Sequence, residues 1–301
     1  MGGMDHQPLS IVELKEMSRQ IRRDIIKMLM ISQSGHSGGP LGLAEVFACL
    51  YFSVLKYDPR NPTWAGRDYF FLSAGHLAPV WYATLARSGF FPVSELRTLR
   101  EINTRLQGHP APWYTHGVPG VEIASGSLGQ GMSVAVGCAL GLRMDKKPNH
   151  VFVLHGDGEL DEGQVWEGLM TAGHYKLDNL TAIVDRNFCQ IDNRTEIVMQ
   201  LEPLADKWAA FGWNVITCDG NSVEEFRQAI SSATNFRGRP SVVIATTLMG
   251  KGVSFMEDDY RWHGIPPSPE QGIQALRELP PTKLGDFVEF QWEKEIAAPV
   301  K

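Results

Sequence analysis

Residues 151–170 read VFVLHGDGELDEGQVWEGLM, and this stretch predicts a buried strand, a glycine-rich turn and then a helix. The strand is almost entirely apolar, which is typical of strands covered on both faces of a parallel sheet. It stops at Gly156, Asp157 and Gly158, after which apolar residues recur at helical spacing. Asp157 therefore stands where a buried strand meets a tight turn, a position typical of both simple turns and ligand-binding loops.

The same alternation continues beyond this stretch. Strands are predicted at 150–155, 180–185, 213–217 and 241–245, and helices at 161–174, 201–211 and 222–233. Apolar strands that alternate with helices imply right-handed crossovers and an α/β fold, with a parallel sheet that carries helices on both faces. In such folds ligands bind beyond the carboxyl ends of the strands. The site is therefore expected in the loops that follow the strands.

The chain before residue 150 is predicted to be mostly helical. Ser10 and Glu13 form a capping-box pattern, and apolar residues at helical spacing follow as far as about residue 33. Further elements are predicted as helices at 43–56, 76–88 and 129–145 and a short strand at 68–73. The helix at 129–145 is rich in glycine and alanine, so we expect neighbouring elements to pack closely on all of its sides.

The composition excludes several classes of function. The 301 residues carry a formal net charge of −6, and their 28 Lys and Arg residues are scattered, so no surface for nucleic acid or an anionic membrane is expected. No apolar run approaches the roughly 20 residues that span a bilayer, and the first ten residues lack the apolar core of a secretion signal. We expect a cytoplasmic protein with one domain, residues 1–265, and a C-terminal tail, residues 266–301, without a second set of strands and helices.

A second polar loop, which contains Asn187, follows the predicted strand at 180–185, just as Asp157 follows the strand at 150–155. If the two strands are parallel, Asp157 and Asn187 lie at the same edge of the sheet. They offer a carboxylate and an amide oxygen, which suit Mg²⁺ or Ca²⁺ better than Zn²⁺. The glycines beside Asp157 let the backbone approach a diphosphate closely. A lone Gly-Asp-Gly is more often a simple turn, but its pairing with Asn187 favours a metal site.

The two loops belong to a longer set of motifs that resembles the transketolase family. GDGELDEGQVWEG at 156–168 and NLTAIVDRN at 179–187 are similar to the thiamine-diphosphate fingerprint. Five further blocks follow the order of the family: GHSGGPLG at 35–42, FLSAGH at 71–76, LQGHP at 106–110, PGVEIASGSLGQG at 119–131 and WHG at 262–264. The resemblance covers about residues 10–265 and is to the N-terminal half of transketolase.

The resemblance implies a thiamine-diphosphate site. Mg²⁺, with Ca²⁺ as an alternative, would be held by Asp157, Asn187 and the backbone carbonyl of Cys189. The other residues implied in cofactor binding are His76, Gly126, Ser127, Leu128, Gly156, Gly158, Glu159 and His263. The histidines that match family positions around the thiazolium carbon, the sugar hydroxyls and the cofactor phosphate are His36, His76, His109 and His263. The remaining histidines have no such match, although His155 lies close to the metal loop.

Two acids near the start of the helix that follows Asp157 have two interpretations. Glu162 and Glu167 can be the ordinary acids that the helix dipole favours near a helix N-terminus. In the family, the matching acids lie at the interface between active sites and take part in a carboxylate network, which makes them candidate catalytic residues. Both interpretations can hold at once.

The resemblance also implies that this chain holds half of a site. Transketolases activate the cofactor with a glutamate of a pyrimidine-binding domain that follows in the same polypeptide, and this chain ends at Lys301 before such a domain begins. It therefore looks like the N-terminal subunit of a split transketolase, with a C-terminal subunit that supplies that domain and its glutamate. Together they would move a two-carbon ketol unit from a ketose phosphate to an aldose or its phosphate. A heterotetramer of two plus two subunits is the assembly that the family suggests.

Three alternatives stay open. The scaffold also serves other ketol and acyl transferases, such as 1-deoxyxylulose-phosphate synthase and the α subunit of 2-oxo-acid dehydrogenases, although GHSGGPLG and WHG fit these less well. A split enzyme for an unusual ketose or 2-oxo acid is the second alternative, because the residues that bind the far end of the sugar would lie on the other chain. The third is a catalytically silent binding protein, against which the retained polar cluster argues.

Overall fold

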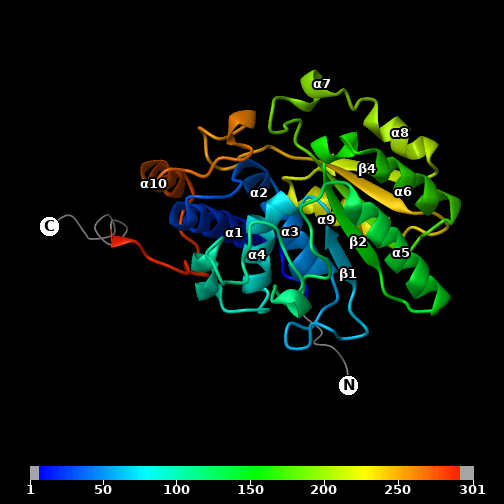
Figure 1. Ribbon diagram of the computed structural model, residues 1–301, viewed down its shortest axis with the longest axis horizontal. Coiled ribbons are helices and arrows are strands. Elements are labelled where there is room, and N and C mark those ends of the chain that lie inside the picture. Colours follow the sequence, from blue (N-terminus) through cyan, green and yellow to red (C-terminus); the bar gives the residue numbers. More distant parts are fainter. Residues whose placement is uncertain (1–6, 292–301) are drawn as a thin grey trace.

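A computed structural model describes residues 7–291 and confirms the parallel α/β sheet (Figure 1). Its strands are β1 (Tyr69–Leu72), β2 (Val151–Gly156), β3 (Leu180–Arg186), β4 (Asn214–Asp219) and β5 (Ser241–Thr246). Their order in the sheet is β1-β2-β3-β5-β4, and every neighbouring pair is parallel. The carboxyl ends of β2 and β3 therefore meet at one edge, as the sequence predicts.

Helices cover both faces of this sheet. Because successive strand side chains point to opposite faces, Phe152 and Leu154 join one apolar cluster, and Val151 and Val153 join the other. The helices that bury the first cluster are α1 (Ile11–Ser32), α3 (Ala44–Cys49), α4 (Ala78–Arg87) and α9 (Val223–Asn235). Those that bury the second are α5 (Gln130–Met144), α6 (Gly163–His174) and α8 (Leu204–Ala210).

Short helical turns connect these elements. They are α2 (Gly38–Gly42), η1 (Leu50–Val54), η2 (Gly75–Leu77), η3 (Val93–Thr98), η4 (Trp113–Thr115), η5 (Gly158–Asp161), α7 (Thr195–Val198) and η6 (Tyr260–Trp262). The predicted capping box at the start of α1 is confirmed, since Ser10 and Glu13 each bond the other's backbone N–H. Within residues 7–291, no helix combines the length and the apolar character needed to cross a bilayer.

Helix α5 corrects one expectation. Met132 and its neighbours on the inner face are buried, but Val134 and Met144 on the outer face are 39% and 81% exposed. A Cβ atom at Gly137 or Gly141 would meet no atom within 4 Å. Close packing on all sides is therefore wrong for this helix in the described chain. Glycine and alanine carry no polar signal, so composition alone cannot separate an exposed face from a packed one.

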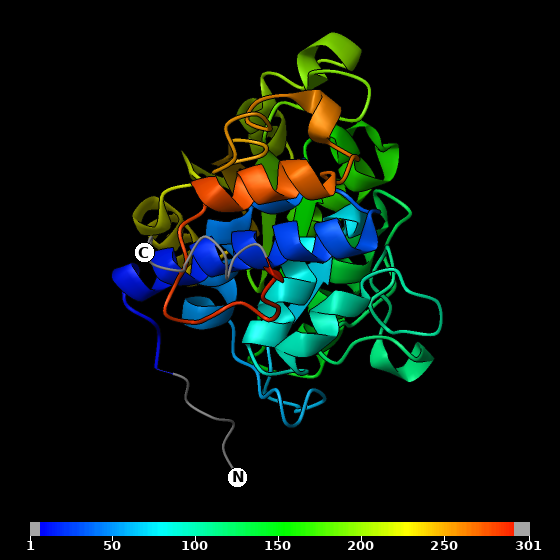
Figure 2. The ribbon, with the colours of Figure 1, turned by 90° about the vertical axis from the view of Figure 1, so that its left-hand side faces the viewer.

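The segment after residue 265, expected from the sequence to be a tail, contains the helix α10 (Pro269–Glu278), which lies along α1 (Figure 2). The side chain of Ser268 caps this helix by accepting the N–H of Gln271. Pro269 occupies the first turn, where a missing N–H costs nothing. These start signals are short and follow a proline-rich stretch, which is why the sequence pattern does not predict the helix.

A buried charge cluster attaches the residues after α10 to α1. Asp286 lies 2.5 Å from the guanidinium of Arg23 and 2.7 Å from the ammonium of Lys27, and it accepts a hydrogen bond from Gln20 at 2.9 Å. Burial opposes ionisation of Asp286, but these three donors outweigh burial and hold its pKa well below the usual range. The cluster therefore stabilises the folded chain while Asp286 is ionised.

Asp286→Asn should lower the free energy of unfolding by about 3 kcal/mol at pH 7, the scale expected when one member of a buried ion cluster is removed. The pKa of Asp286 is lowered in the folded state, so its contribution is present above the usual aspartate pKa of about 3.9 and is lost as the pH falls below that value. Chemical denaturation at pH 7 and pH 3 measures both effects. Asp145→Asn at an exposed position is the control, and equal stability of Asp286→Asn and wild type at pH 7 would contradict the prediction.

Candidate active site

Asp157 and Asn187 lie together at the carboxyl edge of the sheet. Gly156 of β2 pairs with Asp185 of β3, and the N–H of Asp157 donates to the carbonyl of Asp185 at 3.1 Å. Both side chains are buried, with exposed fractions of 1% for Asp157 and 6% for Asn187. The parallel register therefore brings together the carboxylate and the amide that the sequence pairs.

Protein donors fix the orientation of the Asp157 carboxylate. Its Oδ1 accepts the N–H of Gly158 at 2.8 Å, and its Oδ2 accepts the N–H of Phe188 at 2.7 Å and the guanidinium of Arg186 at 3.1 Å. Burial raises the pKa of Asp157 to about 6, although Arg186 and the two N–H donors oppose the rise. A cation beside Asp157 would favour its ionised form and relieve this cost of burial.

The amide of Asn187 is oriented by a second carboxylate. Its nitrogen donates to Asp185 at 2.8 Å, and its oxygen accepts the N–H of Cys189 at 2.9 Å. Asp185 also accepts a short hydrogen bond from the hydroxyl of Thr247. Burial raises the pKa of Asp185 to about 7. The N–H of Cys189 can only donate, so it assigns the amide oxygen of Asn187 to its own side and the amide nitrogen to the side of Asp185.

Three histidine rings from distant parts of the chain meet beside these loops. The ring centroid of His76 lies 5.1 Å from that of His36 and 5.1 Å from that of His263, and the centroids of His36 and His263 are 5.8 Å apart. The rings surround a cavity of about 240 Å³. The predicted residues that line it are His36, His76, His109, Gly126, Leu128, Gly156, Asp157, Gly158, Glu159, Asn187, Cys189 and His263.

Three other predicted residues lie outside this cavity lining. Ser127 is exposed, although its neighbours Gly126 and Leu128 line the cavity. Glu162 directly precedes α6 and Glu167 lies within that helix, and both side chains are exposed. Within the described chain, the two glutamates therefore stand on the surface and not among the histidines.

Burial keeps the histidines of the cluster neutral at pH 7. It lowers the pKa of His36 to about 4, with further lowering by His263, Arg100 and His109. Burial also lowers the pKa of His76 well below its usual value, and it lowers those of His109 and His263. Neutral imidazoles can accept a proton at one nitrogen and donate one from the other.

In the chain without ligands, NMR should show His36 titrating with a midpoint near pH 4, because burial disfavours its cationic form. Since this value lies below the ordinary histidine pKa of about 6.5, protonation favours the unfolded state, and stability should fall as the pH drops from 6.5 toward 4. His36→Gln assigns the resonance. A midpoint near pH 6.5 would contradict the burial argument.

Glu159 joins the loop after β2 to the turn that precedes α5. One carboxylate oxygen accepts the N–H of Gly129 at 2.7 Å and a short hydrogen bond from Ser73, and the other lies 3.1 Å from Nδ1 of His155. Burial opposes the ionised form of Glu159, but His155 and the other donors outweigh it and lower the pKa. Both oxygens of Glu159 thus have protein partners, and the residue also lines the cavity.

Unpartnered ring nitrogens suit a polar ligand in the cavity, and two glycines allow its loops to lie close to neighbouring side chains. In the part of the chain that the structure describes, Nδ1 of His36 and Nδ1 of His263 are buried without a hydrogen-bond partner. A Cβ at Gly126, where φ is 140°, would lie 3.0 Å from His109, and one at Gly158 would lie 2.9 Å from Gln190. Among the described residues, no three His, Cys, Asp or Glu side chains form a metal-binding group, and the predicted ligand set contains only one such side chain.

Arg100 is a candidate site residue that the sequence motifs do not contain. It adopts a left-handed backbone with φ of 61°, and its guanidinium donates to Ser34 at 3.2 Å and lies against Gly108. Burial is the main cause of the lowered pKa values of His36 and His109, and the positive charge of Arg100 lowers both further. Arg100 lies in a turn-rich segment without periodicity, so only its place nine residues before His109 could have pointed to it.

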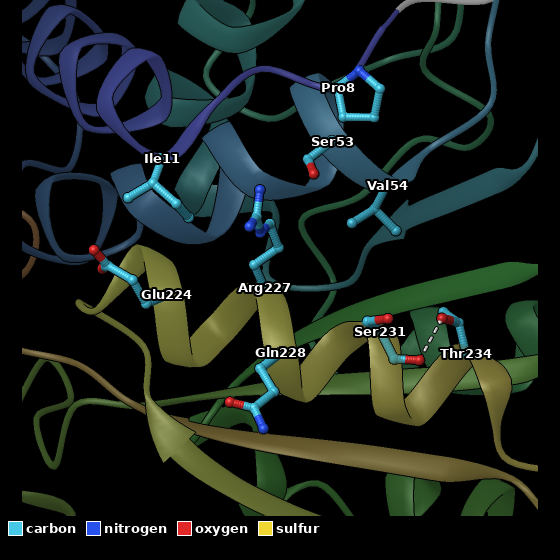
Figure 3. Close-up of a pocket in the computed structure, with 9 residues that line it drawn as sticks. All are labelled: Pro8, Ile11, Ser53, Val54, Glu224, Arg227, Gln228, Ser231 and Thr234. Atoms are coloured by element: carbon cyan, nitrogen blue, oxygen red, sulfur yellow. Dashed lines mark hydrogen bonds between the residues drawn. The ribbon is translucent and has the colours of Figure 1, made fainter.

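A larger hollow, of about 650 Å³, lies between α9, the end of η1 and the residues that lead into α1 (Figure 3). Arg227 projects from α9 into this hollow, near Ser53. Among residues 7–291 the lining contains no histidine, and the one carboxylate that they contribute, Glu224, is paired with Lys15 at 2.6 Å. The chemistry that the sequence predicts therefore belongs to the smaller cavity at the strand ends.

Comparison with known proteins decides the family. Residues 14–285 match the family described as transketolase, thiamine diphosphate binding domain. The chain belongs to this transketolase family. It is 42% identical over 268 residues to the 6-deoxy-6-sulfo-D-fructose transketolase subunit SqwG of Clostridium sp. (strain MSTE9), a match that covers 89% of this chain and 96% of the relative. It is 39% identical to an apulose-4-phosphate transketolase subunit of Phocaeicola vulgatus, covering 90% and 95% of the two chains.

Solved transketolases have the same fold over nearly the whole of this chain. The transketolase from Campylobacter jejuni superposes with a TM-score of 0.86 at 32% identity, covering 96% of this chain and 46% of that one. The transketolase from Leishmania mexicana gives 0.84 at 30% identity, covering 95% and 43%. This chain thus spans less than half of these transketolases and nearly all of the two subunits above. The predicted family, fold class and transketolase type of enzyme are confirmed.

Proposed function

We propose that this chain is the N-terminal subunit of a split transketolase that moves a two-carbon ketol unit from a ketose phosphate to an aldose or its phosphate. The observation that carries this proposal is one cavity at the ends of β2 and β3 that combines the buried Asp157 and Asn187 with four histidines whose pKa values are lowered. A hard cation, a diphosphate and a polyhydroxylated substrate each match part of this lining.

The metal and diphosphate side of the site is assigned to the two loops. Mg²⁺, with Ca²⁺ as an alternative, would bind Asp157, Asn187 and the backbone carbonyl of Cys189, since oxygen ligands suit both cations. Thiamine diphosphate, when bound, supplies the nucleophilic carbon that takes up the ketol unit. The turn of Gly126, Ser127 and Leu128 would lie against its aminopyrimidine. Glu159 supports this assignment by holding that turn through the N–H of Gly129.

The histidines are assigned to the substrate side. His36, His76, His109 and His263 would bind sugar hydroxyls and move protons at their ring nitrogens, and His76 and His263 would also contact the cofactor. Their lowered pKa values suit this work, because a neutral imidazole can act as acceptor and donor. Glu162 and Glu167, exposed near the start of α6, stay candidates for a carboxylate network with another subunit.

We propose that a second subunit supplies the activating acid, because the acids that line the cavity have other protein partners or are assigned to the metal. Asp157 accepts from Arg186 and two backbone N–H groups, Asp185 accepts from Thr247 and Asn187, and both oxygens of Glu159 have donors. The C-terminal subunit would supply the pyrimidine-binding domain and the activating glutamate. Relatives matched over nearly their full length are named as transketolase subunits, which supports this division. The two-plus-two heterotetramer and the cytoplasmic location stay predictions, and we add to them a role in pentose phosphate metabolism.

One observation favours a second candidate substrate class, unusual ketoses. The two subunits of similar length are named for 6-deoxy-6-sulfo-D-fructose and for apulose-4-phosphate. A split enzyme for an unusual ketose would use the same residues of this chain, because in this proposal the cavity would hold the reacting end of the sugar.

Ketol transfer tests the proposal directly. The chain is assayed with thiamine diphosphate, Mg²⁺, a panel of ketose phosphates and an aldose, alone and after co-purification with its stoichiometric partner from the source organism. We expect transfer only with the partner. Transfer by the chain alone would place the activating acid within it and contradict the split site, and no transfer in the complex would favour a silent binding protein.

A further inference from the structure

Arg186 is the last residue of β3 and carries a buried positive charge. Its guanidinium contacts Asp157, one of the two side chains proposed to bind the metal. Its side chain is 2% exposed, and it lies directly beside Asn187 in the sequence. We propose that Arg186 is a positioning residue that holds one oxygen of Asp157, so that the other oxygen is presented to the cation. This inference rests on the metal site of the proposed function.

The two carboxylate oxygens of Asp157 have different hydrogen-bond partners. Oδ2 accepts from Arg186 at 3.1 Å and from the N–H of Phe188 at 2.7 Å, so both of its lone-pair directions are used. Among the described residues, Oδ1 accepts only the N–H of Gly158, at 2.8 Å, and it keeps capacity for another ligand. Rotation of the carboxylate would break the contact with Arg186, so the guanidinium fixes which oxygen stays available.

Arg186 can hold this position because it is itself anchored at several points. The nitrogen that contacts Asp157 also donates to the hydroxyl of Thr195 at 2.7 Å. The other terminal nitrogen donates to Glu196 at 2.6 Å and to Glu202 at 2.9 Å. These partners follow β3 in the segment around α7, and the planar guanidinium reaches them and Asp157 at once. A lysine at this position, with one nitrogen, could not bridge the same set.

The same partners explain why Arg186 can keep its position when a metal cation binds to Asp157. Glu196 and Glu202 lie within 3 Å of the guanidinium and compensate its charge even when Asp157 shares its own charge with a metal. The guanidinium carbon also lies 4.0 Å from the ring centroid of Phe188, which adds a cation–π contact. Arg186 therefore holds Asp157 through Oδ2 and does not compete with the cation for Oδ1.

The test measures how thiamine-diphosphate binding to the complex of this chain with its partner depends on the Mg²⁺ concentration. Calorimetry at a fixed cofactor concentration monitors this binding. Arg186→Gln should raise the Mg²⁺ concentration for half-maximal binding by about 10–100-fold, the usual effect of losing a residue that orients a metal ligand. Saturating Mg²⁺ should restore cofactor binding. Arg186→Lys should give an intermediate shift, and Mn²⁺ binding followed by electron paramagnetic resonance should show the same order without any turnover.

The matched control is Arg194→Gln, which removes a partly exposed arginine of the same segment that pairs with Asp258 at 2.7 Å. It should leave the Mg²⁺ dependence unchanged. An unchanged or lower half-saturation concentration for folded Arg186→Gln overturns the positioning role, and a lower one identifies Arg186 as a competitor of the cation. If thermal melting shows that Arg186→Gln does not fold, the same criteria apply to Arg186→Lys. Absence of Mg²⁺-dependent binding by the wild-type complex overturns the proposed function as well.

Discussion

Asp157→Ala should abolish Mg²⁺-dependent binding of thiamine diphosphate while the chain stays folded. Asp157 is the only carboxylate in the proposed ligand set, so its loss should weaken cofactor binding by more than the ~10–100-fold that loss of a supporting residue costs. The fold should persist because Arg186 keeps its contacts with Glu196 and Glu202. Calorimetry of the complex with the partner at fixed Mg²⁺ measures the affinity, and thermal melting checks the fold.

The control for this variant is Asp161→Ala, which removes an acid of the same loop whose side chain is exposed. Its cofactor affinity should match that of the wild type. Unchanged thiamine-diphosphate affinity in folded Asp157→Ala would remove the metal assignment and leave the Gly-Asp-Gly sequence as a simple turn.

His76→Ala should lower kcat for ketol transfer by about 10²–10⁴-fold, the range expected when a positioned acid–base group is removed. His76 has the largest expected effect among the histidines because its ring lies closest to the other two, with centroids 5.1 Å from His36 and from His263, whereas those two are 5.8 Å apart. Steady-state transfer by the complex at saturating cofactor and Mg²⁺ measures the loss. His263→Ala should show a loss of the same kind.

His174→Ala, at the exposed end of α6, is the matched control and should keep the wild-type kcat. A kcat for His76→Ala within twofold of the wild type would show that the histidine cluster does not take part in the chemistry. In that case the cavity would be a binding site, and the silent-homologue alternative would gain support.

The sequence predicts those parts of the molecule that rest on strong local patterns. The apolar strands around Asp157 and Asn187 fix the parallel sheet, and the neighbouring positions of β2 and β3 then bring the two side chains together. The histidines have no local pattern of their own. His36, His76 and His263 are found only because each lies in a glycine-containing motif that resembles the family, and the structure brings their rings together.

Other features depend on contacts that no local pattern encodes. The exposed outer face of α5 is one, because Gly137 and Gly141 suit an open surface and a close contact equally well. The anchoring of Arg186 is another, since its partners Thr195 and Glu202 come from the short helix α7 and the residues after it, and only the fold defines the path of this segment. The position of Arg100 near the histidines is a third such feature, because Arg100 lies in a turn-rich segment without a periodic pattern.

The most direct test of the metal-anchored cofactor site is a crystal structure of the complex with its partner, grown with thiamine diphosphate and Mn²⁺, in which anomalous scattering locates the metal. We expect the Mn²⁺ peak between the side-chain oxygens of Asp157 and Asn187 and the carbonyl of Cys189, with the diphosphate beside Gly158 and Arg186 still bonded to Asp157. A cofactor bound at the histidines with its metal on other residues, or bound away from this cavity, would contradict the assignment of the site.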